Sequence, residues 1–131
     1  MLFGETGRVL EDMPALETVS VDPENQSYAD ENNLLMSKDK TILYATLYTI
    51  EELVVPASVE VIYSDACWNR YNLKRVIFEG NALQEIRRSA FGNNYYFSEI
   101  IFNGTQEEWD AVDKEGLPHI YTDYTVTCTQ S

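Results

Sequence analysis

The feature that most constrains this 131-residue chain is an apolar pattern that recurs along it. Residues 53–75 and 76–99 carry the same pattern, and Val59 of the first unit corresponds to Leu83 of the second at an offset of 24. Within each unit lies a motif of the form apolar-x-x-apolar-x-apolar. Copies of this motif begin at Leu16, Ile50, Leu73 and Phe97. Two adjacent units of 23–24 residues, with a fainter copy near the start of the chain, indicate a repeat architecture.

The final apolar-x-apolar pair of each motif is expected to form a short strand with alternate side chains pointing inward. One unit cannot bury its own apolar face, so stacked units share a core and align their strands in a parallel sheet. A second apolar pair, Val59/Ile62 or Leu83/Ile86, is expected to line the opposite wall. A period of about 20–29 residues is typical of leucine-rich repeats. The sequence therefore predicts a β-rich repeat solenoid, a leucine-rich-repeat-like right-handed stack with a short parallel sheet, a β-hairpin insertion and a C-terminal helix-plus-strand cap.

The hairpin is predicted at about residues 33–45, where two β-prone runs flank Lys38-Asp39-Lys40. A turn at Asp22–Asn25 precedes it. The insertion explains why the first two strand motifs, at Leu16 and Ile50, lie further apart than the others.

The C-terminal segment is predicted to cap the last repeat. Thr105 and Glu108 have the spacing of a capping box, so a short helix is expected to begin there, with Trp109 and Val112 on one face. Gly116 suits the C-cap of this helix, and a final strand is expected at 121–127. We divide the single domain, residues 1–131, into a partial N-terminal repeat (1–22), the hairpin insertion (23–49), two full repeats with the last strand (50–102) and the cap (103–131).

Composition limits the classes of partner. The formal net charge is −13, which repels phosphate backbones and anionic lipid, so neither nucleic acid nor a membrane surface is expected as a partner. No apolar run is long enough to span a membrane, and no signal peptide is evident in this chain. Five of the nine basic residues cluster between positions 70 and 88, and we interpret them as a solvated face. They are Arg70, Lys74, Arg75, Arg87 and Arg88.

The repeats resemble those of the BspA-like leucine-rich repeat family of bacterial surface proteins, which read roughly strand, Pro-x-x-Val, x-x-Ile, x-x-x-Ala-Phe, Leu-x-x-Ile. Residues 21–43 resemble the hairpin insertion of that family, and 103–112 with 124–128 resemble its terminal segment. The chain departs from the pattern at Cys67, Trp68–Arg70 and Asn93–Tyr95. The resemblance implies export, a role in adhesion or protein binding, and no catalytic residues or cofactor. Because the chain begins inside a repeat, we expect it to be a C-terminal piece of a larger protein.

The sequence assigns no catalytic or metal-binding role to the residues whose chemistry would allow one. His119, the single histidine, follows Pro118 in an irregular stretch and is expected at the surface. Cys67 lies among apolar residues and is expected to be buried, whereas the state of Cys128 is open. An acidic segment lacks the spacing and central glycine of a calcium loop, so no metal is expected. Its carboxylates belong to Asp22, Glu24, Asp30 and Glu31.

The better candidate for function is the outer face of the predicted sheet, formed by the residues between and beside the inward positions. One row would hold Ser20, Val54, Ile77 and Ile101, and the row beside it Thr18, Glu52, Arg75 and Glu99. An apolar stripe with a charged border suits partner contact, although β-branched residues also favour strands for their own sake.

We therefore expect a non-enzymatic module of a bacterial surface or secreted protein that binds a protein or another cell-surface macromolecule through this face. The alternative is a structural spacer, the capped end of a longer solenoid whose ligand contacts lie elsewhere. A hydrolase dependent on His119 is a third possibility. The oligomeric state is open.

Overall fold

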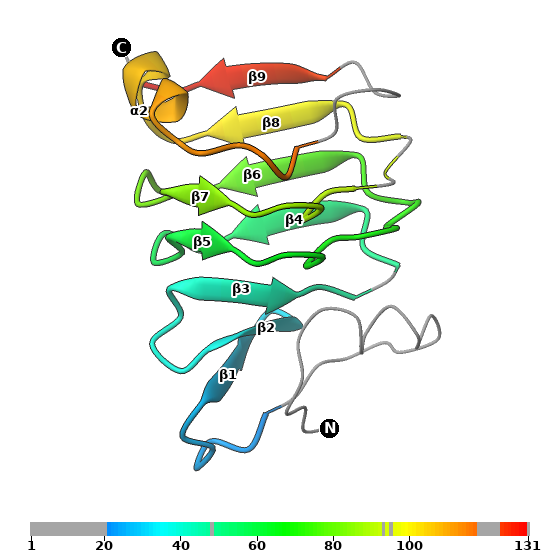
Figure 1. The fold of residues 1–131 in the computed structure, drawn as a ribbon, viewed down its shortest axis with the longest axis vertical. Coiled ribbons are helices and arrows are strands. Elements are labelled where there is room, and N and C mark those ends of the chain that lie inside the picture. The colour runs from blue at the N-terminus through cyan, green and yellow to red at the C-terminus, as the bar shows by residue number, and fades with distance from the viewer. Residues whose placement is uncertain (1–20, 48, 93, 95, 118–123, 131) are drawn as a thin grey trace.

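Successive turns of the chain build two β-sheets in the computed structural model of the protein (Figure 1). The structure describes residues 21–47, 49–92, 94, 96–117 and 124–130. The five-stranded sheet has the order β1-β2-β3-β5-β7, and the four-stranded sheet has the order β4-β6-β8-β9. The strands of the first sheet are β1 (Tyr28–Glu31), β2 (Leu34–Ser37), β3 (Ile42–Ala45), β5 (Val61–Ile62) and β7 (Glu85–Ile86). Those of the second are β4 (Glu52–Val55), β6 (Arg75–Phe78), β8 (Glu99–Phe102) and β9 (Thr125–Cys128).

The four-stranded sheet is parallel throughout, and its register follows the repeat. Leu53 lies opposite Val76, and Val76 lies opposite Ile100. In β6 and β8 buried residues alternate with half-buried ones, as expected when only one face of a strand points into a core. A strand-rich fold with parallel sheets and little helix confirms that part of the predicted fold class.

The other sheet joins the hairpin to the repeats. β2 and β3 pair antiparallel around the turn at Lys38–Lys40, where the sequence predicts a hairpin. β3 also pairs in parallel with β5, and β5 pairs in parallel with β7. The second strand of the hairpin is therefore also the first strand of the repeat sheet, a role that the sequence did not reveal.

Side chains from the two sheets meet in one core. Its fully buried members include Leu53, Val76 and Ile100 from the four-stranded sheet, and Leu43, Ile62 and Ile86 from the five-stranded sheet. Adjacent coils also touch through aromatic rings, since the ring centroids of Phe78 and Phe102, which lie opposite each other on β6 and β8, are 6.1 Å apart. Cys67 is fully buried, as predicted. No coil holds this core alone, because each buries its apolar side chains against those of its neighbours.

One prediction about the basic residues is wrong. Arg70, placed on a solvated face by its charge, is fully buried. Its guanidinium donates to the carbonyl oxygen of Thr46 at 2.9 Å, to the Thr46 hydroxyl at 3.1 Å and to the carbonyl oxygen of Trp68 at 2.6 Å. These hydrogen bonds replace the water that an arginine at the surface would bind.

Beyond β8 the chain forms the short helix α2 (Gln106–Asp110). Thr105 and Glu108 form the predicted capping box: the Glu108 N–H donates to Thr105 Oγ1 at 3.1 Å, and the Thr105 N–H donates to Glu108 Oε1 at 2.9 Å. The latter bond lowers the pKa of Glu108. Trp109 is buried against Phe102, with ring centroids 5.2 Å apart.

Two predictions about this end of the chain need correction. The C-cap of α2 is Ala111, and Gly116 lies beyond the helix. A Cβ atom at Gly116 would come within 1.9 Å of the Arg87 carbonyl oxygen, so glycine is needed there for a close backbone approach. The final strand runs from Thr125 to Cys128, later than the predicted 121–127, and residues 118–123 lie outside the described part.

Candidate binding surface

The outer face of the four-stranded sheet carries the predicted apolar row. Val54 lies opposite Ile77, and Ile77 lies opposite Ile101. All three side chains are half-buried, whereas their neighbours along each strand are buried in the core. The parallel register places them side by side, because adjacent strands of a sheet are only about 4.8 Å apart. We call Val54, Ile77 and Ile101 the apolar row.

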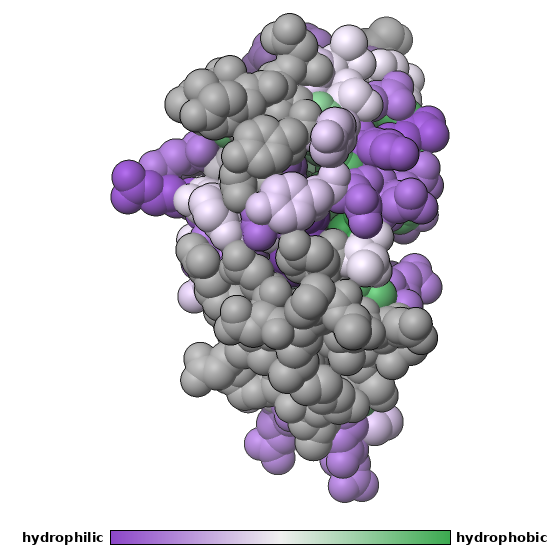
Figure 2. All heavy atoms as spheres, turned by 90° about the vertical axis from the view of Figure 1, so that its right-hand side faces the viewer, coloured by the Kyte–Doolittle hydropathy of each residue, from purple (hydrophilic) through white to green (hydrophobic). Residues whose placement is uncertain are grey.

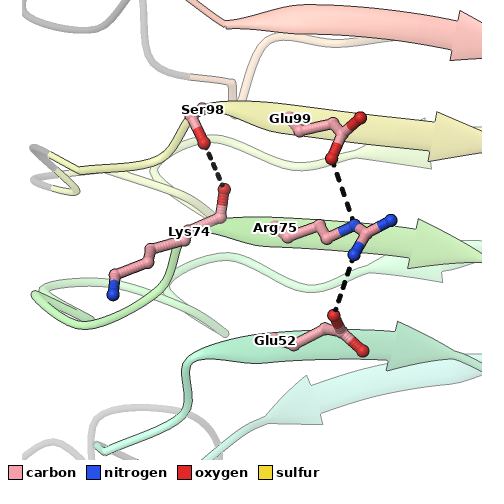
Figure 3. Close-up of polar contacts among 5 residues, drawn as sticks. All are labelled: Glu52, Lys74, Arg75, Ser98 and Glu99. Atoms are coloured by element: carbon pink, nitrogen blue, oxygen red, sulfur yellow. Dashed lines mark hydrogen bonds and ion pairs between the residues drawn. The ribbon is translucent and has the colours of Figure 1, made fainter.

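A ladder of ion pairs runs beside the apolar row (Figure 3). Arg75 lies between two carboxylates: its Nη1 is 3.4 Å from Glu52 Oε2 and its Nε is 3.1 Å from Glu99 Oε1. These side chains stay 38–49% exposed, so solvent screens the pairs and each contributes at most about 1 kcal/mol to stability. Their main effect is to hold three charged groups in a fixed line along the border of the apolar row.

The start of this face is held in register by a second contact in Figure 3. Ser98 Oγ donates to the carbonyl oxygen of Lys74 at 3.1 Å, and the Ser98 N–H donates to the same oxygen at 2.8 Å. Both bonds join the residues that directly precede β6 and β8. The positions of Arg75 and Glu99 are therefore fixed by the backbone as well as by their own ion pair.

The apolar row and the line of charged residues beside it both continue onto β9. The sequence did not predict that β9 would join this sheet. Thr125 lies opposite Glu99, and Thr127 lies opposite Ile101, and both threonines are exposed. The final strand itself was predicted from its β-branched residues, but nothing in its local sequence states which strand it joins. The face therefore ends in hydroxyl-bearing side chains at its C-terminal edge.

Two predicted members of the face, Thr18 and Ser20, lie outside the described residues, as does His119. Six of the eight predicted positions are brought together as expected in one sheet. They are Glu52, Val54, Arg75, Ile77, Glu99 and Ile101.

The described part of the chain places the candidate metal-binding residues and Cys67. Within the described ranges no group of three or more His, Cys, Asp or Glu side chains could hold a metal ion. Burial raises the pKa of the Cys67 thiol to about 11, so this buried thiol is protonated at neutral pH. In the acidic segment, Asp22 Oδ1 accepts from the Glu24 N–H at 2.9 Å within a turn, and Asp30 Oδ1 accepts from the Val21 N–H at 3.1 Å, so both carboxylates bond to the backbone. Of the helices in the described part, none has the length and apolar character to cross a bilayer.

Solved structures with a similar fold are known, although the sequence alone matches no family. No family model matches the sequence, and neither does any curated protein. Among solved structures, a leucine-rich repeat protein from Eubacterium ventriosum matches 69% of this chain at 26% identity with a TM-score of 0.60. The pneumococcal vaccine antigen PcpA matches 63% of the chain at 27% identity with a TM-score of 0.58. A leucine rich cell surface protein from Faecalibacterium prausnitzii matches 82% of it at 14% identity with a TM-score of 0.44.

The repeating register and these neighbours define the class: the chain has the fold of bacterial leucine-rich repeat proteins. The neighbours are consistent with the BspA-like family that the sequence resembles. The chain spans only 24% and 21% of the lengths of the first two matched structures, so the activity of a whole protein of that kind does not carry over to it directly.

Proposed function

We propose that this chain is a non-enzymatic binding module of a bacterial surface or secreted protein, and that it contacts a protein or another cell-surface macromolecule through the outer face of the four-stranded sheet. We also propose that its coils form a right-handed solenoid, with α2 and β9 closing the C-terminal end. The matched structures, a bacterial leucine-rich repeat protein and a pneumococcal vaccine antigen, support the surface assignment.

The observation that carries the proposal is the apolar row beside the ladder of ion pairs. Three half-buried aliphatic side chains lie side by side on the outer face of the sheet, away from the core. A partner would cover apolar surface at the centre of the contact, and the line of Glu52, Arg75 and Glu99 would act as a charged rim that favours one orientation.

The test is binding of the chain to immobilised fibronectin, laminin and fibrinogen, measured by biolayer interferometry. The wild-type chain is expected to bind at least one of them. Ile77→Asp, at the centre of the apolar row, should weaken that binding about thirtyfold, because it places a carboxylate at the desolvated centre of the contact.

Ala82→Asp is the matched control, because it adds the same charge at an exposed position in the turn between β6 and β7. It should bind as the wild type does, and circular dichroism should show that both variants are folded. If the wild type binds none of the three proteins, or Ile77→Asp binds as well as the wild type, the binding role is wrong and the spacer role is favoured.

A further inference from the structure

The outermost strand of the four-stranded sheet, β9, has an edge with which no described strand pairs. β9 ends the strand order, and within the described part of the chain its pairing is with β8 alone (Figure 1). The Thr125 N–H donates toward β8, to the carbonyl oxygen of Ser98 at 3.0 Å. Because the backbone groups of successive strand residues point to opposite sides, those of Val126 and Cys128 point away from β8. Such an edge is a template for a further strand.

The β9 edge lacks the features that usually protect an edge strand, which are charged side chains, proline and bulges. Residues 124–130 contain no charged residue and no proline, although the chain has nine basic and twenty-two acidic residues. By contrast β1, at the edge of the other sheet, carries Asp30 and Glu31. Near the top of the molecule, at the level of β9, Figure 2 shows described side chains of intermediate hydropathy bordered by strongly hydrophilic ones. The edge is therefore open to strand addition.

The strand is complementary to itself when two copies run antiparallel. A two-fold axis through Thr127, perpendicular to the sheet, would place Val126 opposite Cys128 of the second copy. These residues would exchange both of their N–H···O bonds, and so would the symmetry-related pair, which satisfies the outward backbone groups of β9. Val126 and Cys128 are half-buried against the core, and each would cover the remaining exposed surface of the other. The exposed Thr127 would meet its own copy on the outer face, a favourable cross-strand pair.

We propose that two copies of the chain pair along β9, antiparallel and centred on Thr127, as a weak dimer. The contact continues the strand-by-strand pairing that already joins β4, β6, β8 and β9. A contact between two four-residue strands buries far less than the ~1,200–2,000 Å² of stable complexes, so we expect a dissociation constant of about 0.5 mM. The apolar rows of the two copies would then lie in line on one continuous face. The proposal does not depend on whether that face binds a partner.

The charge of the chain predicts how this dimer responds to salt. At a net charge of −13 two copies repel each other, whereas the strands that meet carry no charge. Added salt screens the repulsion, and the contact contains no ion pair that salt would weaken. Association should therefore strengthen several-fold between about 0.02 and about 0.2 M NaCl, opposite to the response of a contact held by ion pairs.

An engineered disulfide tests the pairing and its register together. In a Cys128→Ser background, with Cys67 fully buried, Thr127→Cys places two thiols at a non-hydrogen-bonded pair whose Cα atoms are about 4.5 Å apart, within disulfide reach. Thr125→Cys is the matched control: it is exposed on the same strand and face, but its two copies would lie about 14 Å apart. With oxidised glutathione, the Thr127→Cys chains should form the covalent dimer at least about tenfold faster on non-reducing gels. Equal rates for the two variants overturn the proposal.

Sedimentation velocity of the full chain measures the association itself. Val126→Pro removes an outward N–H at an edge where proline is tolerated, and should raise the dissociation constant at least about tenfold. Val126→Ala also loses the valine side chain but keeps the N–H, so it should stay within about threefold of the wild type. If circular dichroism shows that Val126→Pro is unfolded, the cross-linking comparison decides.

Three sedimentation results would overturn the dimer. They are association that weakens with salt, a folded Val126→Pro variant that associates like Val126→Ala, and a wild-type chain that stays monomeric at about 1 mM. The last result would favour a strand of another protein as the occupant of the edge. Loss of binding to the matrix proteins in Ile77→Asp, with the dimer unchanged, would leave this proposal standing, so the two proposals fail separately.

Discussion

At the scale of single residues, three buried polar side chains occupy equivalent places in successive coils. Thr46, Arg70 and Asn94 are separated by 24 residues each and are all buried. They bind carbonyl oxygens inside the turns that carry the chain from one sheet to the other, which would otherwise be buried without donors. The sequence analysis placed Arg70 at the surface because charged side chains are usually exposed. Its alignment with Asn94 at the repeat offset was a signal that it could be internal.

Replacing Arg70 should therefore cost more stability than replacing any exposed basic residue. Arg70→Met keeps an unbranched side chain of similar length but leaves the carbonyl oxygens of Thr46 and Trp68 without these donors. We expect the free energy of unfolding, from urea denaturation, to fall by about 2 kcal/mol or more. The matched variant Arg88→Met, at an exposed site, should stay within about 0.5 kcal/mol of the wild type. Equal losses in the two variants would show that the Arg70 hydrogen bonds contribute little.

The buried thiol of Cys67 gives a prediction about pH. Burial raises its pKa from 9.0 to about 11, so the unfolded chain loses this proton first as the pH rises. The free energy of unfolding should fall between about pH 9 and pH 11, by at most about 1.4 kcal/mol per pH unit from this group. Cys67→Ala should lack this component of the fall, while burial still raises the pKa of Tyr44 and of Tyr124 in both proteins. Parallel pH profiles for the two proteins would contradict the assignment.

At the scale of elements, prediction from sequence succeeded where the signal is local and failed where it depends on a distant segment. The capping box of Thr105 and Glu108 was predicted because both partners lie within one turn of the helix. Gly116 was read as a helix C-cap, but its role depends on Arg87, 29 residues earlier in the chain. The pairing of β3 with β5, and of β9 with β8, likewise has no local signature.

The capping box should make α2 sensitive to a single hydroxyl. Thr105→Ala removes the acceptor of the Glu108 N–H and should lower the free energy of unfolding by about 1 kcal/mol. Thr105→Ser keeps the acceptor and should remain close to the wild type. Chemical denaturation of all three proteins checks this. A serine variant as unstable as the alanine variant would mean that the threonine methyl group, and not the cap, is responsible.

The close approach at Gly116 should make that position intolerant of any side chain. Gly116→Ala places a methyl group against the Arg87 carbonyl oxygen and disturbs the hydrogen bond from the Gly116 N–H to the Ile86 carbonyl oxygen, now 3.0 Å. We expect a loss of about 2 kcal/mol in the free energy of unfolding. Hydrogen exchange should show the faster opening at Ile86 and Phe91, whose N–H groups bond to residues 113 and 116. Unchanged protection there would refute this explanation of the glycine.

At the scale of the whole molecule, the repeat offset organises both the interior and the outer face of the four-stranded sheet. The same 23–24-residue step that stacks Leu53, Val76 and Ile100 in the core places Val54, Ile77 and Ile101 on the outer face and the loops of Tyr71 and Tyr96 side by side. The sheet face could be predicted because inward and outward residues alternate along a strand. The exposure of Tyr71 and Tyr96 could not, because these rings come from irregular segments in which exposed and buried residues do not alternate.

The proposed binding role depends on the parallel strands placing Val54, Ile77 and Ile101 side by side on the outer face of the sheet. Methyl-selective NMR of the wild-type chain, with nuclear Overhauser contacts recorded among Val54, Ile77 and Ile101, tests it most directly. We predict contacts from Ile77 to both Val54 and Ile101, none directly between Val54 and Ile101, and stronger broadening of these methyl groups by a soluble paramagnetic agent than of those of Leu53 and Val76. Absence of the Ile77 contacts, or equal protection of the two sets, would contradict the account.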